Sequence, residues 1–175
     1  DLTLTILKNN NIIDEQLNWA YGDGHLVIVG DIFDRGSKVT ELLWFFYNLE
    51  TQAEKSGGMV HYLLGNHEYM VMQNDLRYIN PKYAFTSKLL NRPYDELFGK
   101  QSVLGRWLRS KATILKINDI IFVHGGISEE FIANQFDLER TNRDMRHYLV
   151  DTITTKRDSV YNKYFNSDGP IWYRG

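Results

Sequence analysis

Three apolar segments of this chain end in glycine together with side chains that can bind an ion or a proton. The segments read HLVIVGD (25–31), MVHYLLGNHE (59–68) and DIIFVHGG (119–126). Uninterrupted apolar runs of this length are typical of strands that are covered on both faces. Glycine at their ends permits tight turns and a close approach of the backbone to a ligand. The pattern therefore predicts an α/β fold with a polar site where the strands end.

The segment between the first two strands has the spacing of a helix. Residues 37–55, SKVTELLWFFYNLETQAEK, place apolar side chains three and four positions apart, and Ser37 is the predicted N-cap. Strand, helix and strand in this order predict a right-handed βαβ unit with parallel strands. Because ligands in open α/β sheets bind at the carboxyl ends of such strands, we expect the three polar groups to converge on one site.

Weaker patterns predict the remaining elements. We expect a short helix within residues 1–10, and a strand, a turn at 22–24 and a second strand over residues 18–31. Asn118-Asp119 is the expected turn of a β-hairpin. Helices are expected around 83–90 and 102–109, and on the outside of the domain within the charged stretch 129–163.

Composition excludes several classes of function. The chain has no cysteine, so disulfides and thiolate chemistry are excluded, and a metal site must use His, Asp, Glu or Asn. A formal charge of -2 gives no sign of a nucleic-acid-binding surface. No apolar run is long enough for a membrane span. Cytoplasmic and periplasmic locations both stay open.

The residues at the strand ends suit divalent cations and phosphate. Asp31 can bridge two cations, Asn66 offers a carbonyl oxygen and His124 an imidazole nitrogen. Two cations about 3.5–4 Å apart can clamp the attacking and leaving oxygens of a phosphoryl group. Each residue also has an ordinary structural interpretation, as a turn former or a core histidine, but their joint occurrence favours a site.

The neighbouring residues add acid–base and phosphate-binding groups. Arg35 carries a planar fork of donors that matches phosphate oxygens. His67 is placed to protonate a leaving alkoxide, and Asp34 could orient its imidazole and keep it protonated. These residue types together predict phosphoryl-transfer chemistry.

The three polar motifs resemble a known family. GDIFDRG (30–36), GNHE (65–68) and HGG (124–126) are similar, in order and separation, to signature blocks of calcineurin-like metallophosphoesterases of the phosphoprotein phosphatase type. GRWLRSK and DLRYINPKY make the chain resemble the bacterial Shewanella-like phosphatase branch most. The resemblance covers most of the chain. It implies a metallophosphoesterase fold, in which helices flank a central β-sandwich and the active site lies at the strand carboxyl ends.

The resemblance also implies the metal ligands. Asp31 would bridge two divalent metal ions, and Asn66 and His124 would bind the second ion. Mixed oxygen and nitrogen ligands admit Mn, Fe, Zn or Co, so the residues do not identify the metal.

For the remaining residues the resemblance implies catalytic and phosphate-binding roles. His67 would be the general acid and Asp34 its partner, while Arg35 would hold the phosphate together with Arg174 of the terminal WYRG. The implied reaction is hydrolysis of phosphomonoesters by a hydroxide that two metal ions activate. The implied partner is a phosphorylated protein, dephosphorylated at Ser, Thr or Tyr, or a small phosphoester.

Two alternatives stay open. WLRSK and HGGIS are also similar to dinucleoside polyphosphate hydrolases of the same superfamily. The second alternative is a non-catalytic phosphate-binding or scaffold protein.

Two family blocks have no counterpart here. The Asp-x-His block that supplies ligands to the first metal is absent, and so is the late Gly-His block, since His147 lies in a charged helical stretch and is predicted to be a surface residue. We therefore expect residues 1–175 to be a single metallophosphoesterase domain that lacks the family's first strand and its C-terminal part. Whether three ligands suffice for two metals stays open.

Several other residues lie outside the predicted site or at its border. His25 and His61 are expected to be structural, and Tyr69 and Tyr78 could line a substrate groove. Arg77 and Arg109 fit phosphate binding and surface ion pairs equally well.

Overall fold

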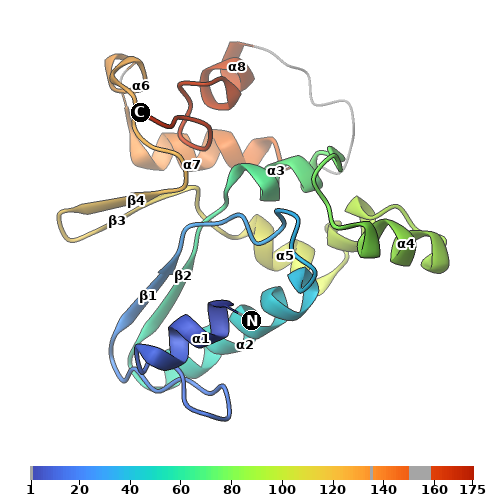
Figure 1. Cartoon of the computed structure of the whole chain (residues 1–175). Coiled ribbons are helices and arrows are strands. Elements are labelled where there is room, and N and C mark those ends of the chain that lie inside the picture. Colours follow the sequence, from blue (N-terminus) through green and yellow to red (C-terminus); the bar gives the residue numbers. More distant parts are fainter. Residues whose placement is uncertain (1, 135, 150–158) are drawn as a thin grey trace.

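The computed structural model describes residues 2–134, 136–149 and 159–175 (Figure 1). Its helices and strands are, in order, α1 (Leu2–Asn9), β1 (His25–Ile28), α2 (Val39–Lys55), β2 (Met59–Tyr62), α3 (Asn66–Met72), α4 (Pro81–Leu90), the 3-10 helix η1 (Asp95–Phe98), α5 (Val103–Arg109), β3 (Ile114–Ile117), β4 (Ile120–Val123), α6 (Glu129–Ala133), α7 (Leu138–His147) and α8 (Ser159–Phe165). None of these helices is both long and apolar enough to cross a bilayer.

The predicted βαβ unit is confirmed. β1 and β2 are parallel neighbours, with His25 opposite Met59 and Ile28 opposite Tyr62. α2 joins them and packs on β2 through its buried stripe, Val39, Leu43, Phe46, Leu49 and Ala53. The i, i+3 and i+4 spacing of that stripe explains why this segment forms a helix with one apolar face.

The predicted N-cap of α2 is wrong by one residue. The helix begins at Val39, its N-cap is Lys38, and no side chain caps it. Ser37 contributes its backbone carbonyl instead, which accepts a hydrogen bond of 2.9 Å from the Lys82 ammonium group. An N–H of the first turn, that of Thr40, donates at 3.3 Å to the hydroxyl of Tyr83 in the distant α4.

The strand expected before residues 22–24 does not form among the described residues. Trp19 makes only an isolated bridge with Ile13. Its backbone N–H donates to the Gln52 side chain at 2.8 Å, and its indole N–H donates to the carbonyl of Gly22 at 2.9 Å. Because these groups are satisfied by a helix side chain and by the turn, no second strand is needed.

The predicted hairpin is confirmed. β3 and β4 are antiparallel, with Ile117 opposite Ile120, and Asn118 adopts the left-handed conformation (φ 53°) that such turns favour. A parallel bridge between Leu63 and Ala112 connects the end of β2 to the segment that enters β3. This bridge fixes the position of the hairpin relative to the βαβ unit.

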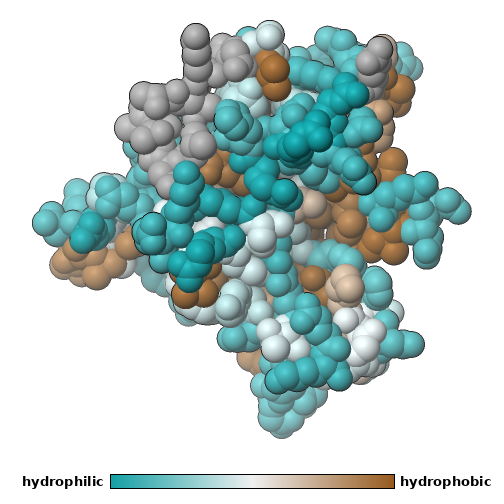
Figure 2. Space-filling view, turned by 180° about the vertical axis from the view of Figure 1, so that it is seen from behind, coloured by the Kyte–Doolittle hydropathy of each residue, from teal (hydrophilic) through white to brown (hydrophobic). Residues whose placement is uncertain are grey.

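Two elements project from the body on opposite sides in Figure 1, the β3–β4 hairpin and α4. Both expose apolar side chains: Ile120 and Ile121 on the hairpin, and Phe85, Leu89 and Leu90 on α4. In the view from behind, hydrophobic surface is visible on both projections, while much of the face between them is hydrophilic (Figure 2).

The C-terminal part of the chain returns to the end of β4. The helices expected within residues 129–163 are present as α6, α7 and α8, although residues 135 and 150–158 of that stretch lie outside the described part. After α8, the carbonyl of Pro170 accepts a hydrogen bond of 2.9 Å from the N–H of Gly125. A Cβ atom at Gly125 would lie 2.7 Å from that carbonyl oxygen, which explains the glycine.

Candidate functional site

The loop after β1 lies directly against the start of α3. Gly30 (φ 88°) and Asp31 (φ 63°) both have left-handed backbone conformations. A Cβ atom at Gly30 would lie 2.3 Å from the backbone nitrogen of Gly65. Glycine at positions 30 and 65 therefore allows the two strand ends to touch. The Asp31 carboxylate then accepts a hydrogen bond of 3.2 Å from the N–H of His67.

A buried carboxylate that sequence reasoning missed holds this loop in place. Glu68 is fully buried and accepts four hydrogen bonds, each of 2.8 to 2.9 Å. The donors are the N–H groups of Asp31, Ile32 and Gly65 and the hydroxyl of Tyr62. The signal in the sequence was a glutamate three residues after Gly65, the spacing of a capping box at the start of a helix.

The hydrogen-bond donors around Glu68 favour its ionised form, whereas burial and the neighbouring Asp31 charge leave the pKa of Glu68 above its ordinary value. Burial raises the pKa of Glu68, and the N–H of Asp31 acts in the opposite direction. Burial and the neighbouring Glu68 hold the pKa of Tyr62 well above its ordinary value, so its hydroxyl keeps its proton and donates. Three of the four partners are backbone N–H groups that can only donate, whereas the Tyr62 hydroxyl could also accept.

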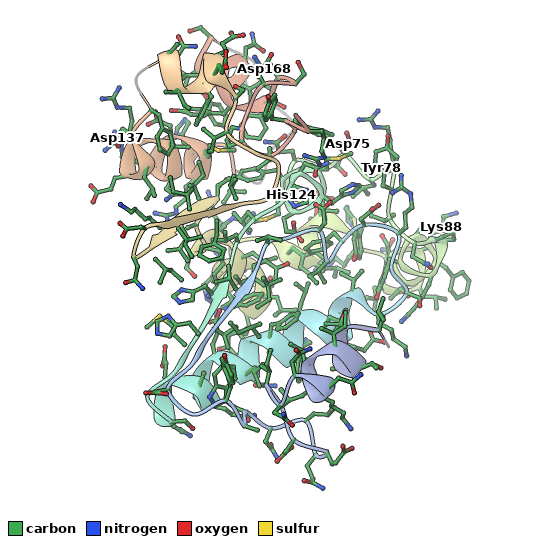
Figure 3. The ribbon with its side chains drawn as sticks, turned by 60° about the vertical axis from the view of Figure 1, so that its left-hand side comes forward. Asp75, Tyr78, Lys88, His124, Asp137 and Asp168 are labelled. Atoms are coloured by element: carbon green, nitrogen blue, oxygen red, sulfur yellow. The ribbon has the colours of Figure 1, made fainter. Side chains whose placement is uncertain are left out.

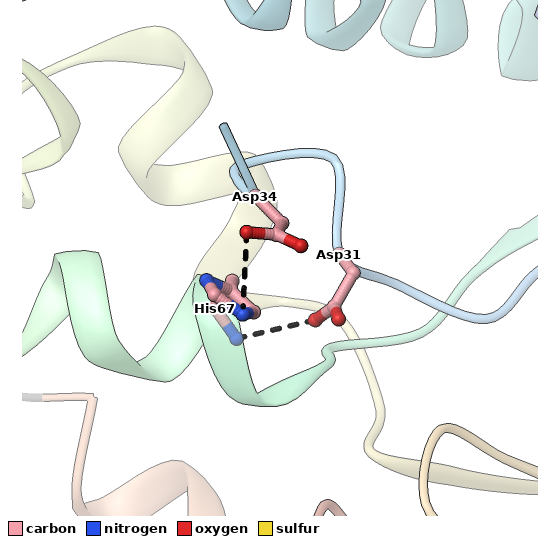
Figure 4. A group of neighbouring side chains, drawn as sticks. All are labelled: Asp31, Asp34 and His67. Atoms are coloured by element: carbon pink, nitrogen blue, oxygen red, sulfur yellow. Dashed lines mark hydrogen bonds and ion pairs between the residues drawn. The ribbon is translucent and has the colours of Figure 1, made fainter. Parts of the chain in front are cut away.

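Asp31, Asp34 and His67 form a compact cluster (Figure 4). One ligand atom from each lies within 4.8 Å of the others. Nε2 of His67 is 3.6 Å from Oδ1 of Asp34, which is too long for a hydrogen bond. The same Oδ1 accepts a hydrogen bond of 2.5 Å from the guanidinium of Arg35. The structure thus brings Asp34 to His67, as expected, but Arg35 shares the carboxylate.

His124 approaches the cluster from the end of β4. Its Nδ1 lies 2.7 Å from the carbonyl oxygen of Val29, so Nδ1 carries the proton and donates it there. Its Nε2 faces Oδ2 of Asp31 at 3.1 Å. Nη2 of Arg174 lies 3.3 Å from the same Nε2, so the C-terminal arginine is brought to the site.

The His124–Asp31 pair changes the pKa of both groups. Burial lowers the pKa of His124, but the Asp31 carboxylate outweighs it and leaves this pKa above its ordinary value. Burial likewise raises the pKa of Asp31, and the hydrogen bond and charge of His124 bring it below its ordinary value. A cation bound between them would displace the proton from Nε2.

Asn66 provides the observation that fits a bound cation best. The residue is 3% exposed, and its side-chain oxygen has no hydrogen-bond partner in the described part of the chain. A buried carbonyl oxygen without a partner is costly unless something else satisfies it. Asn66 directly precedes His67 at the start of α3. Its amide oxygen, the carboxylates and the imidazoles together form a donor set that suits Mn, Fe or Zn.

Two ligand sets are compatible with these positions. The family resemblance implies Asp31, Asn66 and His124, with His67 left free as an acid. The compact cluster allows Asp31, Asp34 and His67 to hold one ion between them. The two sets share Asp31 and differ in whether His67 binds metal.

The structure shows hydrogen-bond partners for Arg77 and Arg109, the two arginines whose role the sequence left open. Arg77 forms a two-pronged ion pair with Asp75, at 2.8 and 2.7 Å. Arg109 donates to the backbone carbonyls of Leu149, Phe98 and Gly105, which is a structural role.

The two tyrosines named above differ in burial and in their contacts, and the remaining histidines lie outside the cluster of Asp31, Asp34 and His67. Tyr69 is buried and bonded to Thr113, whereas Tyr78 is exposed and contacts both His67 and Arg35. His25 and His61 lie in neighbouring strands with ring nitrogens 3.0 Å apart. His147 is exposed, as predicted.

Comparisons with known proteins agree with this geometry. A solved Shewanella structure, described as a cold-active protein-tyrosine phosphatase, is 48% identical and superposes with a TM-score of 0.95 over 99% of this chain and 53% of its own. Shewanella-like protein phosphatase 2 of Arabidopsis thaliana is 27% identical and matches 95% of this chain and 52% of itself. An uncharacterized Schizosaccharomyces pombe protein is 31% identical over 90% of this chain and 48% of its own length.

This chain therefore spans about half the length of the relatives it matches. The high TM-score shows a metallophosphoesterase fold of mixed α/β type, as predicted. The family model described as calcineurin-like phosphoesterase matches residues 6–172. Since that match covers nearly the whole chain, the chain belongs to the calcineurin-like phosphoesterase family.

Proposed function

We propose that the protein hydrolyses phosphomonoesters, and that phosphorylated side chains of proteins are its substrates. The observation that supports this most is the grouping of Asp31, Asp34 and His67 with two guanidiniums, those of Arg35 and Arg174, at the strand ends. Such a grouping combines candidate metal ligands, a proton donor and phosphate-binding groups. Two of the relatives are named as protein phosphatases, which favours protein dephosphorylation over dinucleoside polyphosphate hydrolysis and over a scaffold role.

The family implies a dinuclear divalent metal centre. We propose that Asp31, Asn66 and His124 contribute its ligands from this chain. When bound, the two ions would supply Lewis acidity that activates water and offsets the charge of the phosphoryl oxygens. The hydrogen bond from Nδ1 of His124 to Val29 would keep Nε2 directed at the ion, since such outer contacts fix the ring orientation of a metal-binding histidine.

The other side chains act on the phosphoryl group and the leaving group. Arg35 uses one donor on Asp34 and retains further donors for phosphate oxygens. Nη1 of Arg174 is held by the carbonyl of Tyr173 at 3.0 Å, and its Nη2 points to His124. His67, 8% exposed, donates the proton to the leaving oxygen, and Asp34 stabilises the protonated ring.

A substrate panel tests this function. The full-length protein, loaded with Mn, should release phosphate from phosphotyrosine and phosphoserine peptides, and EDTA should abolish this turnover. Diadenosine tetraphosphate serves as the comparison substrate. Turnover of the dinucleotide alone would replace our proposal with the polyphosphate hydrolase, and no turnover with any substrate or metal would favour the scaffold.

Substitution of His67 distinguishes the two ligand sets. His67→Asn should lower kcat on phenyl phosphate by roughly 10²–10⁴-fold, because general-acid catalysis contributes about that much, while metal content stays unchanged. Metal analysis by mass spectrometry supplies the second measurement. His147→Asn, at an exposed histidine outside the site, is the matched control. Loss of metal from the His67 variant would instead assign His67 as a ligand together with Asp31 and Asp34.

A further inference from the structure

Tyr78 contacts two residues of the proposed site at once. Its ring meets the His67 imidazole edge to face, with centroids 5.3 Å apart and planes at 68°. The guanidinium carbon of Arg35 lies 4.7 Å from the centroid of the same ring. Both distances are within the range of favourable aromatic and cation–π contacts. Tyr78 therefore connects the proposed proton donor with the proposed phosphate-binding arginine.

The backbone of Arg35 also depends on the loop that carries Tyr78. The N–H of Arg35 donates to the carbonyl of Tyr78 at 3.0 Å. The carbonyl of Arg35 accepts a hydrogen bond of 3.0 Å from the Asn80 side chain. Arg35 has a φ of 54°, a left-handed conformation that costs energy for a residue with a side chain. Bonds to both of its peptide groups hold it there.

Asp34 alone does not fix the His67 ring. The 3.6 Å between Nε2 and the carboxylate exceeds a hydrogen bond, and the same oxygen is already bonded to Arg35. The Tyr78 ring also packs against the imidazole, edge to face. Packing of this kind can fix the orientation of the His67 ring, which the long ion pair with Asp34 does not fix by itself.

The loop is itself anchored, so the Tyr78 ring is a firm support. Arg77, next to Tyr78, has its guanidinium carbon 5.5 Å from the ring centroid, and Asp75 holds that guanidinium in place. Figure 3 shows Asp75 and Tyr78 close together on the loop that follows α3. Tyr78 is nevertheless 36% exposed, so part of its surface is accessible to a substrate.

We propose that Tyr78 is a positioning residue that orients His67 toward the leaving-group oxygen and Arg35 toward the phosphoryl oxygens. The inference rests on the proposed phosphatase function and extends it to a residue without an ionised group. A tyrosine acting through His67 matters most for poor leaving groups, because only these need a proton as the P–O bond breaks. Acting through Arg35, it strengthens binding of free phosphate as well.

The test compares Tyr78→Leu with Tyr78→Phe in the full-length, metal-loaded protein. Substrates are p-nitrophenyl phosphate, whose leaving group needs no proton, and phenyl phosphate, whose leaving group is more basic. For Tyr78→Leu, kcat should fall roughly tenfold more on phenyl phosphate than on p-nitrophenyl phosphate, and the inhibition constant of inorganic phosphate should rise several-fold. Tyr78→Phe keeps the ring and should stay within about twofold on each measurement.

The control is Tyr21→Leu, which removes another exposed tyrosine that packs only on Trp19 among the ring contacts described. Tyr78→Met is the second variant, should Tyr78→Leu fail to fold. Equal losses on both substrates with unchanged phosphate inhibition would overturn the proposal, and so would no loss at all. If the parent protein hydrolyses neither substrate, the proposed phosphatase function is wrong. The role of Tyr78 is then decided by calorimetry, in which Tyr78→Leu should bind inorganic phosphate more weakly than the parent protein.

Discussion

Replacement of Asp31 by Asn should remove bound metal and lower kcat/KM for p-nitrophenyl phosphate by on the order of a thousandfold, equivalent to about 4 kcal/mol of transition-state stabilisation. Asp31 is common to both ligand sets, and its two oxygens contact His124 and the N–H of His67. The amide of Asn has nearly the same size but no charge, so it cannot bridge two cations as a carboxylate does. Metal content and phosphate release, measured on the same preparation, check the expectation.

Asp34→Asn is the matched control, because it removes a charge from the neighbouring carboxylate. If Asp34 acts on His67 and Arg35, this variant keeps its metal and loses activity on poor leaving groups first. If Asp34 binds metal in the compact cluster, it loses metal as Asp31→Asn does. Full metal occupancy in Asp31→Asn would contradict both ligand sets.

The βαβ unit and the proximity of Asp31, Asp34 and His67 could be predicted because they depend on local patterns. The apolar runs and the helical stripe of α2 are long, and parallel strands joined by a helix place their carboxyl ends together. Asp31 and His67 follow their strands within a few residues, so their meeting was foreseeable. His124 comes directly after β4, which belongs to the separate antiparallel pair with β3, so the rule for parallel strands does not account for its approach to Asp31.

The features that were predicted wrongly or not at all depend on contacts between segments that are distant in the sequence. Gln52 satisfies the backbone of Trp19 and removes the need for a strand there. Lys82 donates to the carbonyl of Ser37, and the Tyr83 hydroxyl accepts from the N–H of Thr40 at the start of α2. Tyr78 stacks on Arg35 across more than forty positions of sequence. Neither spacing nor residue type encodes such pairings, so they became visible only in the folded chain.

Replacement of Glu68 by Gln should lower the free energy of unfolding by about 3 kcal/mol. Each carboxylate oxygen accepts two hydrogen bonds: Oε2 from Asp31 and Gly65, and Oε1 from Ile32 and Tyr62. An amide keeps one acceptor oxygen and turns an NH₂ group toward two of the donors. The Tyr62 hydroxyl can turn and accept from that NH₂ group, but at least one buried backbone N–H loses its partner, which costs about 1–3 kcal/mol, and the charge-assisted bonds of the carboxylate are lost as well.

Two further variants isolate the cause of this loss. Tyr62→Phe removes one donor and leaves the carboxylate with three, so it should cost only about 1 kcal/mol. Glu54→Gln makes the same chemical change on the exposed face of α2 and should leave stability unaltered. Chemical denaturation of all three variants, followed by circular dichroism, gives the comparison.

The outcome also decides the charge on Glu68. If Glu68→Gln stays within about 0.5 kcal/mol of the parent, the side chain is neutral in the folded protein, because an amide would then imitate it well. A loss near the expected value means that an ionised glutamate holds the N–H groups of Asp31 and Ile32. In that case metal affinity should fall together with stability, since the same hydrogen bonds set the left-handed turn that presents the Asp31 carboxylate to the site.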